Sequence, residues 1–185
     1  EKIKNREGVK FIVTLRAVQE VLRMLESESG EVVVKVDENQ ALFETKTTQL
    51  TTRLIDGNYP DYEKIIPKDY VTETTFKKSD FIDKVRLVSV FSGKTNDIHL
   101  NFDSKEQKVN LAASSSEVSE GNTEFKTTLK GGNVEIVFNH RYLLDGLQNV
   151  KGETIHFQLN SNTKPSLIKA SKDASYRYVV MPIRE

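Results

Sequence analysis

The same pattern of apolar and polar positions occurs three times along the chain. Each copy reads as a strand, a short helix and a run of strands in which apolar residues alternate with polar ones. The last apolar residue before each helix is Val13, Phe76 or Phe138, so the copies begin 63 and 62 residues apart. Two apolar positions of each helix then coincide, namely Val18, Phe81 and Leu143, followed by Leu22, Val85 and Leu147. A period of this length indicates one supersecondary unit used repeatedly.

A single copy cannot bury both its sheet and its helix, so the copies are expected to pair. Three copies give one pair and leave the first without a partner, which suggests that the chain begins inside a domain. We expect residues 1–69 to be the second half of one domain and residues 70–185 to be a complete domain. The two copies of that domain should share one continuous sheet with two helices on one face, an α+β arrangement.

Sequence signals also predict where the helices and strands lie. Thr14 is expected to cap the first helix and Gly30 to end it. The second helix should cover residues 77–91, and the third residues 141–149 with Asn139 as its N-cap. Strands are expected at residues 11–13, 32–36, 41–45, 50–55, 98–102, 109–113, 125–129, 134–138, 155–159, 167–170 and 176–183, with a polar turn at 114–121.

Composition is typical of a globular protein and narrows the possible chemistry. The 185 residues are 37% hydrophobic and 29% charged, and the formal net charge is zero, so any basic surface must be local. The chain has no cysteine, which removes disulfides, thiolate metal sites and cysteine nucleophiles. No apolar run reaches about 18 residues, so no membrane partner is expected. The polar N-terminus reads as a loop or linker left by truncation and not as a signal peptide.

The sequence contains no recognisable catalytic constellation. None of the three histidines, His99, His140 and His156, has metal-ligand spacing, and a solvated strand position is the simpler role for the first and last. Residues 92–95 look like the tail of a phosphate-binding loop, but Val88 stands where that motif requires glycine. We therefore expect no metal, no cofactor and no enzyme. An enzyme that uses carboxylates is the weaker hypothesis.

Two surface features favour binding. The helices carry basic residues such as Arg16 and Arg23 on the sides away from their apolar stripes, which suits a phosphate backbone. An ordinary solvated helix face is the alternative. Near the C-terminus, Pro182 should lead the chain out of the sheet and leave Met181 and Ile183 partly exposed, as in a groove for a partner peptide.

Four segments of the chain together carry a family resemblance. The chain reads LIDGNYPDY at residues 54–62, followed by IIP, and it reads YVVMPIR at residues 178–184. Two shorter matches are added by residues 138–139 with 142–145 and by residues 11–13 with 21–25. Together they resemble the beta subunit of bacterial DNA polymerase III, the sliding clamp. The first segment is similar to the end of that family's second domain, the second to its C-terminus, and the resemblance covers the chain from about Val9.

The resemblance implies a DNA clamp fold, in which repeated strand-helix-strands units pair into domains. Members of the family close as a homodimer ring around duplex DNA in the cytoplasm. They tether the DNA polymerase III catalytic subunit, the clamp loader and other proteins with a clamp-binding motif, which keeps a released polymerase at high effective concentration. The ring has no catalytic residues, metal or cofactor.

Residue by residue, the resemblance implies three surfaces. The partner-peptide pocket would use Pro60, Lys64, Ile65, Asn139, Tyr142, Ser166, Val179, Val180, Met181, Pro182, Ile183 and Arg184, with Tyr142 as a movable gate. The DNA-facing residues would be Arg16, Arg23, Lys77, Lys78 and Lys84. The subunit interface would include Val90 and Phe91.

The chain departs from the family in two respects. The family's first domain, and the threonine-aspartate-glycine-histidine-arginine segment of its second, have no counterpart here. We therefore expect about half of a clamp subunit, which cannot close a ring by itself. The chain also ends in Glu185, where an apolar residue is common, and an acid there should weaken peptide docking or recruit a basic residue of the partner. A repeat-built peptide-binding module without DNA contact is the alternative function.

Overall fold

The computed structural model describes residues 9–28, 30–115, 118–171 and 176–184. The expectations for the N-terminal linker and for Glu185 lie outside these residues. The chain divides into two compact units, Glu1–Pro60 and Asp61–Glu185, called here the N-terminal part and the C-terminal part. The domain boundary near residue 69 remains a prediction. None of the helices in the described ranges is long and apolar enough to cross a membrane.

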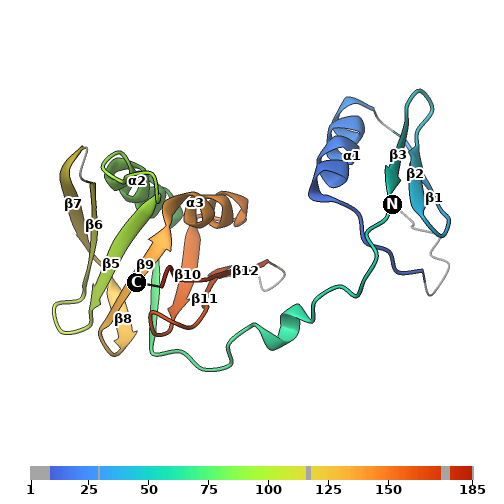
Figure 1. Ribbon diagram of the computed structural model, residues 1–185. Helices are drawn as coiled ribbons and strands as arrows, with labels where there is room; N and C mark the ends of the chain where they lie inside the picture. The colour runs from blue at the N-terminus through green and yellow to red at the C-terminus, as the bar shows by residue number, and fades with distance from the viewer. Residues whose placement is uncertain (1–8, 29, 116–117, 172–175, 185) are drawn as a thin grey trace. The chain divides into compact units, whose positions relative to one another are not determined.

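The N-terminal part contains one helix and one three-stranded antiparallel sheet (Figure 1). Its elements are α1 (Leu15–Ser27), β1 (Val33–Val36), β2 (Gln40–Glu44) and β3 (Gln49–Arg53), in the sheet order β1-β2-β3. Thr14 caps α1 as expected, because its hydroxyl accepts a hydrogen bond from Ala17 N at 3.2 Å. The strand expected at residues 11–13 is not formed. That segment accepts one backbone hydrogen bond, from Ile55 N to Ile12 O at 2.8 Å, which does not make a ladder.

The described residues of the C-terminal part form two α-helices, one 3-10 helix and two antiparallel sheets. The sheet orders are β12-β11-β10-β4-β8 and β7-β6-β5-β9. The elements are the 3-10 helix η1 (Tyr62–Lys64), β4 (Thr72–Lys77), α2 (Lys78–Ser89), β5 (Asp97–Asp103), β6 (Lys108–Ser115), β7 (Val118–Lys126), β8 (Thr128–Gly131), β9 (Val134–Asn139), α3 (His140–Asn149), β10 (Thr154–Leu159), β11 (Ser166–Ala170) and β12 (Arg177–Val180).

The expectation of one continuous sheet is wrong, because the two copies exchange strands. The strand before α2 is β4, and it pairs with β10 of the following copy. The strand before α3 is β9, and it pairs with β5 of the preceding copy. The strand expected at residues 125–129 is accordingly two strands in different sheets, β7 and β8. The chain turns between them at Thr127, whose N–H donates to Gln107 O at 2.9 Å and whose hydroxyl donates to Thr75 O at 3.1 Å.

Three further boundaries differ from the sequence prediction. The polar segment 114–121 is mostly strand, since β6 reaches Ser115 and β7 begins at Val118, and the backbone pairs across this hairpin. The α2 helix is shorter than expected and ends in tight turns, with Phe91 N bonded to Val88 O at 3.0 Å. The last strand ends at Val180, and the tail leaves the sheet as the proline predicted.

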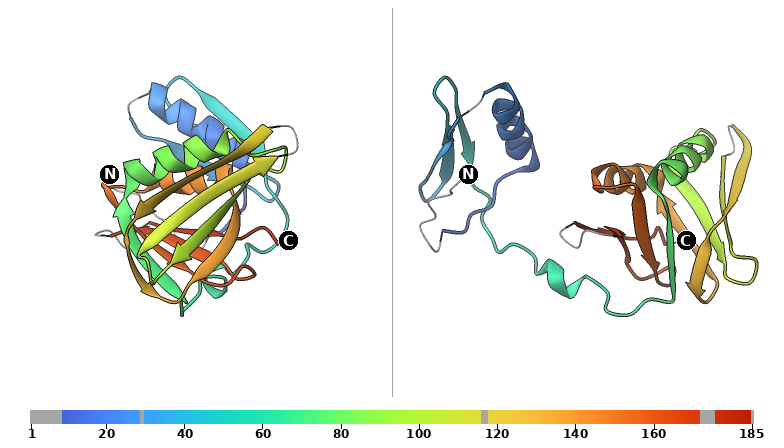
Figure 2. Two further views of the ribbon diagram at one scale, coloured as in Figure 1. Left: turned by 90° about the vertical axis from the view of Figure 1, so that its left-hand side faces the viewer. Right: turned by 180° about the vertical axis from the view of Figure 1, so that it is seen from behind.

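The core of the C-terminal part lies between the two sheets and the two helices. Phe157 is fully buried at its centre, with ring centroids of Phe81, Phe102 and Phe138 within 6.0–6.1 Å. The α2 and α3 helices are in contact and lie side by side (Figure 2). The apolar positions aligned in the sequence, Phe81 with Leu143 and Val85 with Leu147, are all completely buried. The residues Thr14, Lys77 and Asn139 all occupy N-cap positions, which confirms the alignment of the three copies.

Candidate binding surfaces

The first turn of α3 presents an exposed aromatic side chain. Asn139 caps the helix, because its side-chain oxygen accepts a hydrogen bond from Arg141 N at 3.0 Å. This bond fixes the direction in which the helix leaves β9. Tyr142, in that first turn, remains 60% exposed. An exposed aromatic ring on a rigid helix is suited to contact an apolar partner.

Two tyrosines attach β12 to the middle of α3. The ring of Tyr178 occupies the space above Gly146, so closely that a Cβ added there would lie 2.3 Å from it. The hydroxyl of Tyr176 donates to Gly146 O at 3.0 Å. Burial raises the pKa of both phenols. The glycine therefore allows the last strand to lie directly against the helix that carries Tyr142.

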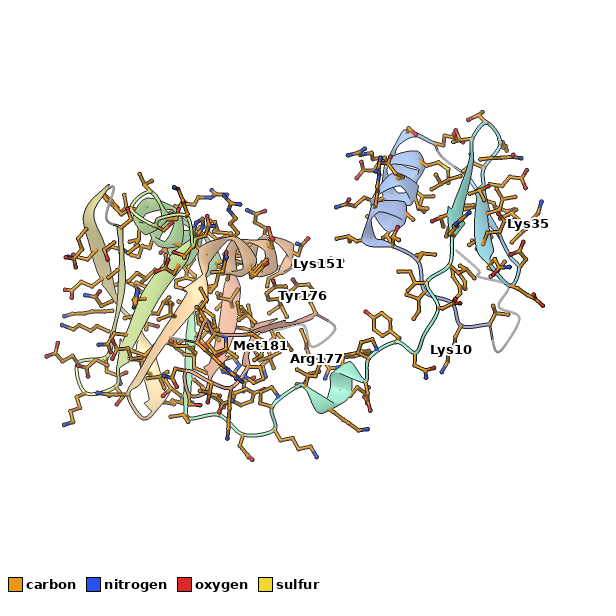
Figure 3. All side chains as sticks on the ribbon, in the orientation of Figure 1. Lys10, Lys35, Lys151, Tyr176, Arg177 and Met181 are labelled. Atoms are coloured by element: carbon orange, nitrogen blue, oxygen red, sulfur yellow. The ribbon has the colours of Figure 1, made fainter. Side chains whose placement is uncertain are left out.

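The C-terminal tail follows the edge of β9. Val180 is the last residue of β12 and pairs with Ser166 of β11. Two residues beyond it, Pro182 is buried and Ile183 N donates to Val137 O at 2.8 Å. Met181 is 49% exposed between these two fixed points. Figure 3 labels Met181, which follows β12, together with Tyr176, which precedes the strand, and Arg177, its first residue. The tail thus holds an apolar side chain at the surface on a well-anchored backbone.

The structure brings together part of the expected peptide pocket within the C-terminal part. Tyr142 lies in α3, which Asn139 caps from the end of β9, and residues 179–180 lie in β12, which contacts α3. Residues 181–184 follow β12. Ser166 lies below them but is fully buried, and its hydroxyl has no hydrogen-bond partner, so it offers no surface to a ligand. The remaining expected residues lie elsewhere. Pro60 ends the N-terminal part, whereas Lys64 pairs with Asp61 at 2.9 Å and Ile65 is exposed at the start of the C-terminal part.

The five expected DNA-facing residues fall into two groups. Arg16, Arg23 and Lys77 are exposed, with Arg23 paired to Glu20 at 3.0 Å and Lys77 only 3.8 Å from Asp80. Such exposed pairs are weak and exchange readily with other anions.

The other two lysines, Lys78 and Lys84, are half-buried, and their ammonium groups contact other elements of the C-terminal part. The ammonium of Lys78 donates to Val150 O at 2.8 Å, which satisfies a carbonyl at the end of α3. Lys84 lies 5.6 Å from the centre of the Phe125 ring and 3.3 Å from Glu124 O. Their contacts are therefore structural.

The two expected interface residues differ in exposure. Val90 is 70% exposed, just beyond the end of α2. Phe91 is partly buried against the core, and its ring fills the space over Gly121, where an added Cβ would lie 2.0 Å away. The structure therefore presents Val90 at the surface and uses Phe91 to fix the end of the helix.

Sequence reasoning missed Gly146 and Tyr178, the pair that positions the tail. The available signal was the glycine itself, because glycine inside a helix lowers its stability and usually has a packing reason. The sequence does not reveal which aromatic residue needs the space, since the two positions are 32 residues apart in the chain.

Among the described residues, His156 on β10 and Glu73 on β4 form a close pair of titratable side chains. Across the described residues, no group of three or more His, Cys, Asp and Glu could hold a metal ion. His156 Nε2 lies 3.0 Å from Glu73 Oε2 on the face of β10 and β4 opposite the core. Burial lowers the pKa of His156, with Lys169 acting in the same direction, although Glu73 opposes both. The pair is thus a hydrogen bond on a sheet surface.

The exchanged strands, paired sheets and side-by-side helices of the C-terminal part define a DNA clamp fold. Sequence comparison names the family. The chain belongs to the DNA polymerase III beta subunit family, whose central-domain model matches residues 1–61 and whose C-terminal-domain model matches residues 63–184.

Individual relatives agree with this assignment. The beta sliding clamp of Synechococcus elongatus is 29% identical over 182 residues, covering 96% of this chain and 48% of that protein. The crystal structure of the DNA polymerase III subunit beta from Pseudomonas aeruginosa gives a TM-score of 0.85 at 27% identity, covering 95% of this chain and 48% of that one. The crystal structure of the C. crescentus beta sliding clamp gives a TM-score of 0.87 at 28% identity, covering 98% of this chain and 48% of that one. The chain therefore spans about half the length of these relatives.

Proposed function

We propose that this chain forms the C-terminal half of a DNA sliding clamp, a non-catalytic processivity factor that acts in the cytoplasm. In the whole protein, two subunits would close a ring around duplex DNA and tether the replicative polymerase, the clamp loader and other proteins with a clamp-binding motif. The observation that carries the proposal is the match of two consecutive clamp domain models, in order, along the whole chain.

The partner-peptide pocket is proposed to lie beside the C-terminal tail. Tyr142 and Met181 would supply exposed apolar contacts, and Asn139 and Arg184 would supply polar ones at the rim. Pro182 would act indirectly, since it is buried and shapes the tail. Pro60, Lys64 and Ile65 would complete the pocket as the family resemblance implies.

Peptide binding tests this proposal directly. A fluorescent peptide with a clamp-binding motif is titrated with the 185-residue chain and read by fluorescence anisotropy. Met181→Ala should weaken binding about tenfold, as expected for an apolar contact near an interface centre. Val71→Ala is a matched control, because Val71 is 47% exposed and Met181 is 49% exposed. Equal affinity of Met181→Ala and the wild type, or no rise in anisotropy at millimolar concentrations of the chain, would contradict the pocket.

DNA contact is proposed to rest on Arg16, Arg23 and Lys77, whose charged ends are least committed to other partners. A few exchangeable phosphate contacts bind without reading sequence, which is what a sliding ring requires.

Charge reversal separates this function from a peptide-binding module without DNA contact. In a complete subunit that contains this chain, changing Arg16, Arg23 and Lys77 together to Glu should reduce the amount of clamp retained on circular DNA. Lys130→Glu on β8 is the control, since Lys130 is exposed but lies outside the helices. Unchanged retention after the triple reversal would favour the module.

A further inference from the structure

A row of polar and basic side chains crosses the outward face of the five-stranded sheet. The row has one residue from each strand, in register from β12 to β8, and its members are Arg177, Lys169, His156, Thr75 and Thr128. It faces away from the core, because it alternates along the strands with the buried Ile168, Phe157 and Phe76. We call its first three members the basic row. Neighbouring strands are about 4.8 Å apart, so the basic row spans about 10 Å.

The repeat offers an internal comparison for the basic row. His99 occupies in the second copy the place of His156 in the third, since each is the third residue of the first strand after its helix. The residues in register with His99 are Ala112 on β6 and Val137 on β9, and Asn122 on β7 follows Ala112. None of these neighbours is charged, although both sheets pack against the same core. The fold therefore does not require basic residues at these positions, and a binding role explains them.

The cationic side chains of this face are not committed to acids. Lys130, Lys169 and Arg177 form no ion pair with another described residue. Glu73 is the acid among the outward-facing residues of the five strands, all of which are described, and it lies 3.0 Å from His156 Nε2. Burial, Lys169 and Lys130 lower the pKa of His156 while Glu73 raises it, so both lysines are within electrostatic reach of the ring. The face thus carries excess positive charge in a chain whose formal net charge is zero.

A polar hollow of about 270 Å³ adjoins the middle of the row. Its lining contains no apolar residue and consists of Glu73, Thr74, Thr75, Thr128, Lys130 and His156. Because a water molecule occupies about 30 Å³ in the liquid, the hollow has room for a side chain of several non-hydrogen atoms. Its hydroxyl and ammonium donors suit a charged side chain and not an apolar one.

We propose that this face binds an acidic peptide segment of a partner protein, with carboxylates on the basic row and one of them in the hollow. In an extended peptide, the side chains of alternate residues are about 7 Å apart, so two carboxylates fit within the basic row. A nucleic acid fits less well, because so short a row neutralises few phosphates and phosphate binding strengthens with their number. This inference does not depend on the proposed clamp function.

Peptide titration tests the proposal. A fluorescent peptide of alternating glutamate and serine is titrated with the 185-residue chain at about 50 mM salt, where charge contacts are only partly screened. The anisotropy should rise. Lys169→Glu and Arg177→Glu should each weaken binding at least about fivefold, because an attraction becomes a repulsion. Arg177 is exposed and Lys169 is partly exposed, so both variants should keep the fold, which their amide NMR spectra would show.

The matched control is Lys126→Glu on β7, which changes the net charge equally on the outward face of the other sheet. The proposal predicts unchanged affinity for this variant. Equal losses in all three variants would overturn it, since net charge alone would then explain binding. No rise in anisotropy at millimolar concentrations of the chain would overturn it as well. A single-stranded oligothymidylate of the same charge is the second probe. Its tighter binding, with the same dependence on Lys169 and Arg177, would replace the peptide as the occupant.

Discussion

A methyl group at position 146 should disturb the last strand from inside the helix. In Gly146→Ala the new Cβ would lie 2.3 Å from Tyr178 Cδ1 and 2.5 Å from its Cε1, well inside van der Waals contact. Because the ring is partly buried against the core, it can move only by displacing β12 or by distorting α3. Overpacking of this kind costs about 1–3 kcal/mol. Alanine gains about 1 kcal/mol over glycine inside a helix. We therefore expect a net loss of about 1 kcal/mol.

A double-mutant cycle measures the clash separately from helix propensity. Urea unfolding followed by circular dichroism should give a lower free energy of unfolding for Gly146→Ala than for the wild type. In a Tyr178→Ala background the same change should be stabilising by about 1 kcal/mol, because only the propensity remains. Peptide affinity should fall in the single variant, since the tail follows β12. A stabilised Gly146→Ala in the wild-type background would refute the reasoning.

Two further changes test local contacts. Hydrogen bonds from three threonine hydroxyls, with Thr45 contributing most, lower the pKa of Glu28 from 4.5 to about 2. The pKa of Glu28 is lower in the folded chain than in the unfolded chain, so the ionised carboxylate stabilises the fold. This stabilisation is complete above pH 4.5 and is lost as the pH falls toward 2. Amide NMR signals of Thr47 and Thr48, whose hydroxyls donate to Glu28, should follow that loss. Glu28→Gln should remove this part of the pH dependence and leave the part that comes from Asp37 and Glu44, whose pKa values are also lowered by hydrogen bonds. Lys78→Met breaks the bond to Val150 O and should cost about 1 kcal/mol in urea unfolding, whereas exposed Lys77→Met should be nearly neutral. Equal losses in the two lysine variants would show that the bond to α3 contributes nothing.

The positions of helices and most strands could be predicted from the sequence because they depend on local signals. Thr14 and Asn139 cap helices through side chains that reach only two or three residues along the chain. Alternation likewise gives the buried face of each strand. It does not give the partner strand, and so the exchange of β4 and β9 between copies could not be predicted. The turn at Thr127 depends on Gln107 and Thr75, which are distant in sequence.

The candidate site shows the same limit. The family resemblance indicated which residues belong to the tail and to the start of α3, but not which of them are accessible. Ser166 is buried because it pairs with Val180 in the interior of a five-stranded sheet. Lys78 is committed to a carbonyl 72 residues away. Burial and pairing of this kind follow from tertiary packing and not from the local pattern.

The repeat also explains why the tail is available for binding. In each copy, the segment that closes the copy hydrogen-bonds to the segment before its own helix, as Ile55 N does to Ile12 O in the first copy. The second copy does this with a full ladder, in which β8 pairs with β4 over four residues. The third copy makes the equivalent contact with β9 through the bond from Ile183 N to Val137 O. The proposed peptide-binding tail thus closes the third copy beside β9 as β8 closes the second copy beside β4, and it leaves Met181 at the surface.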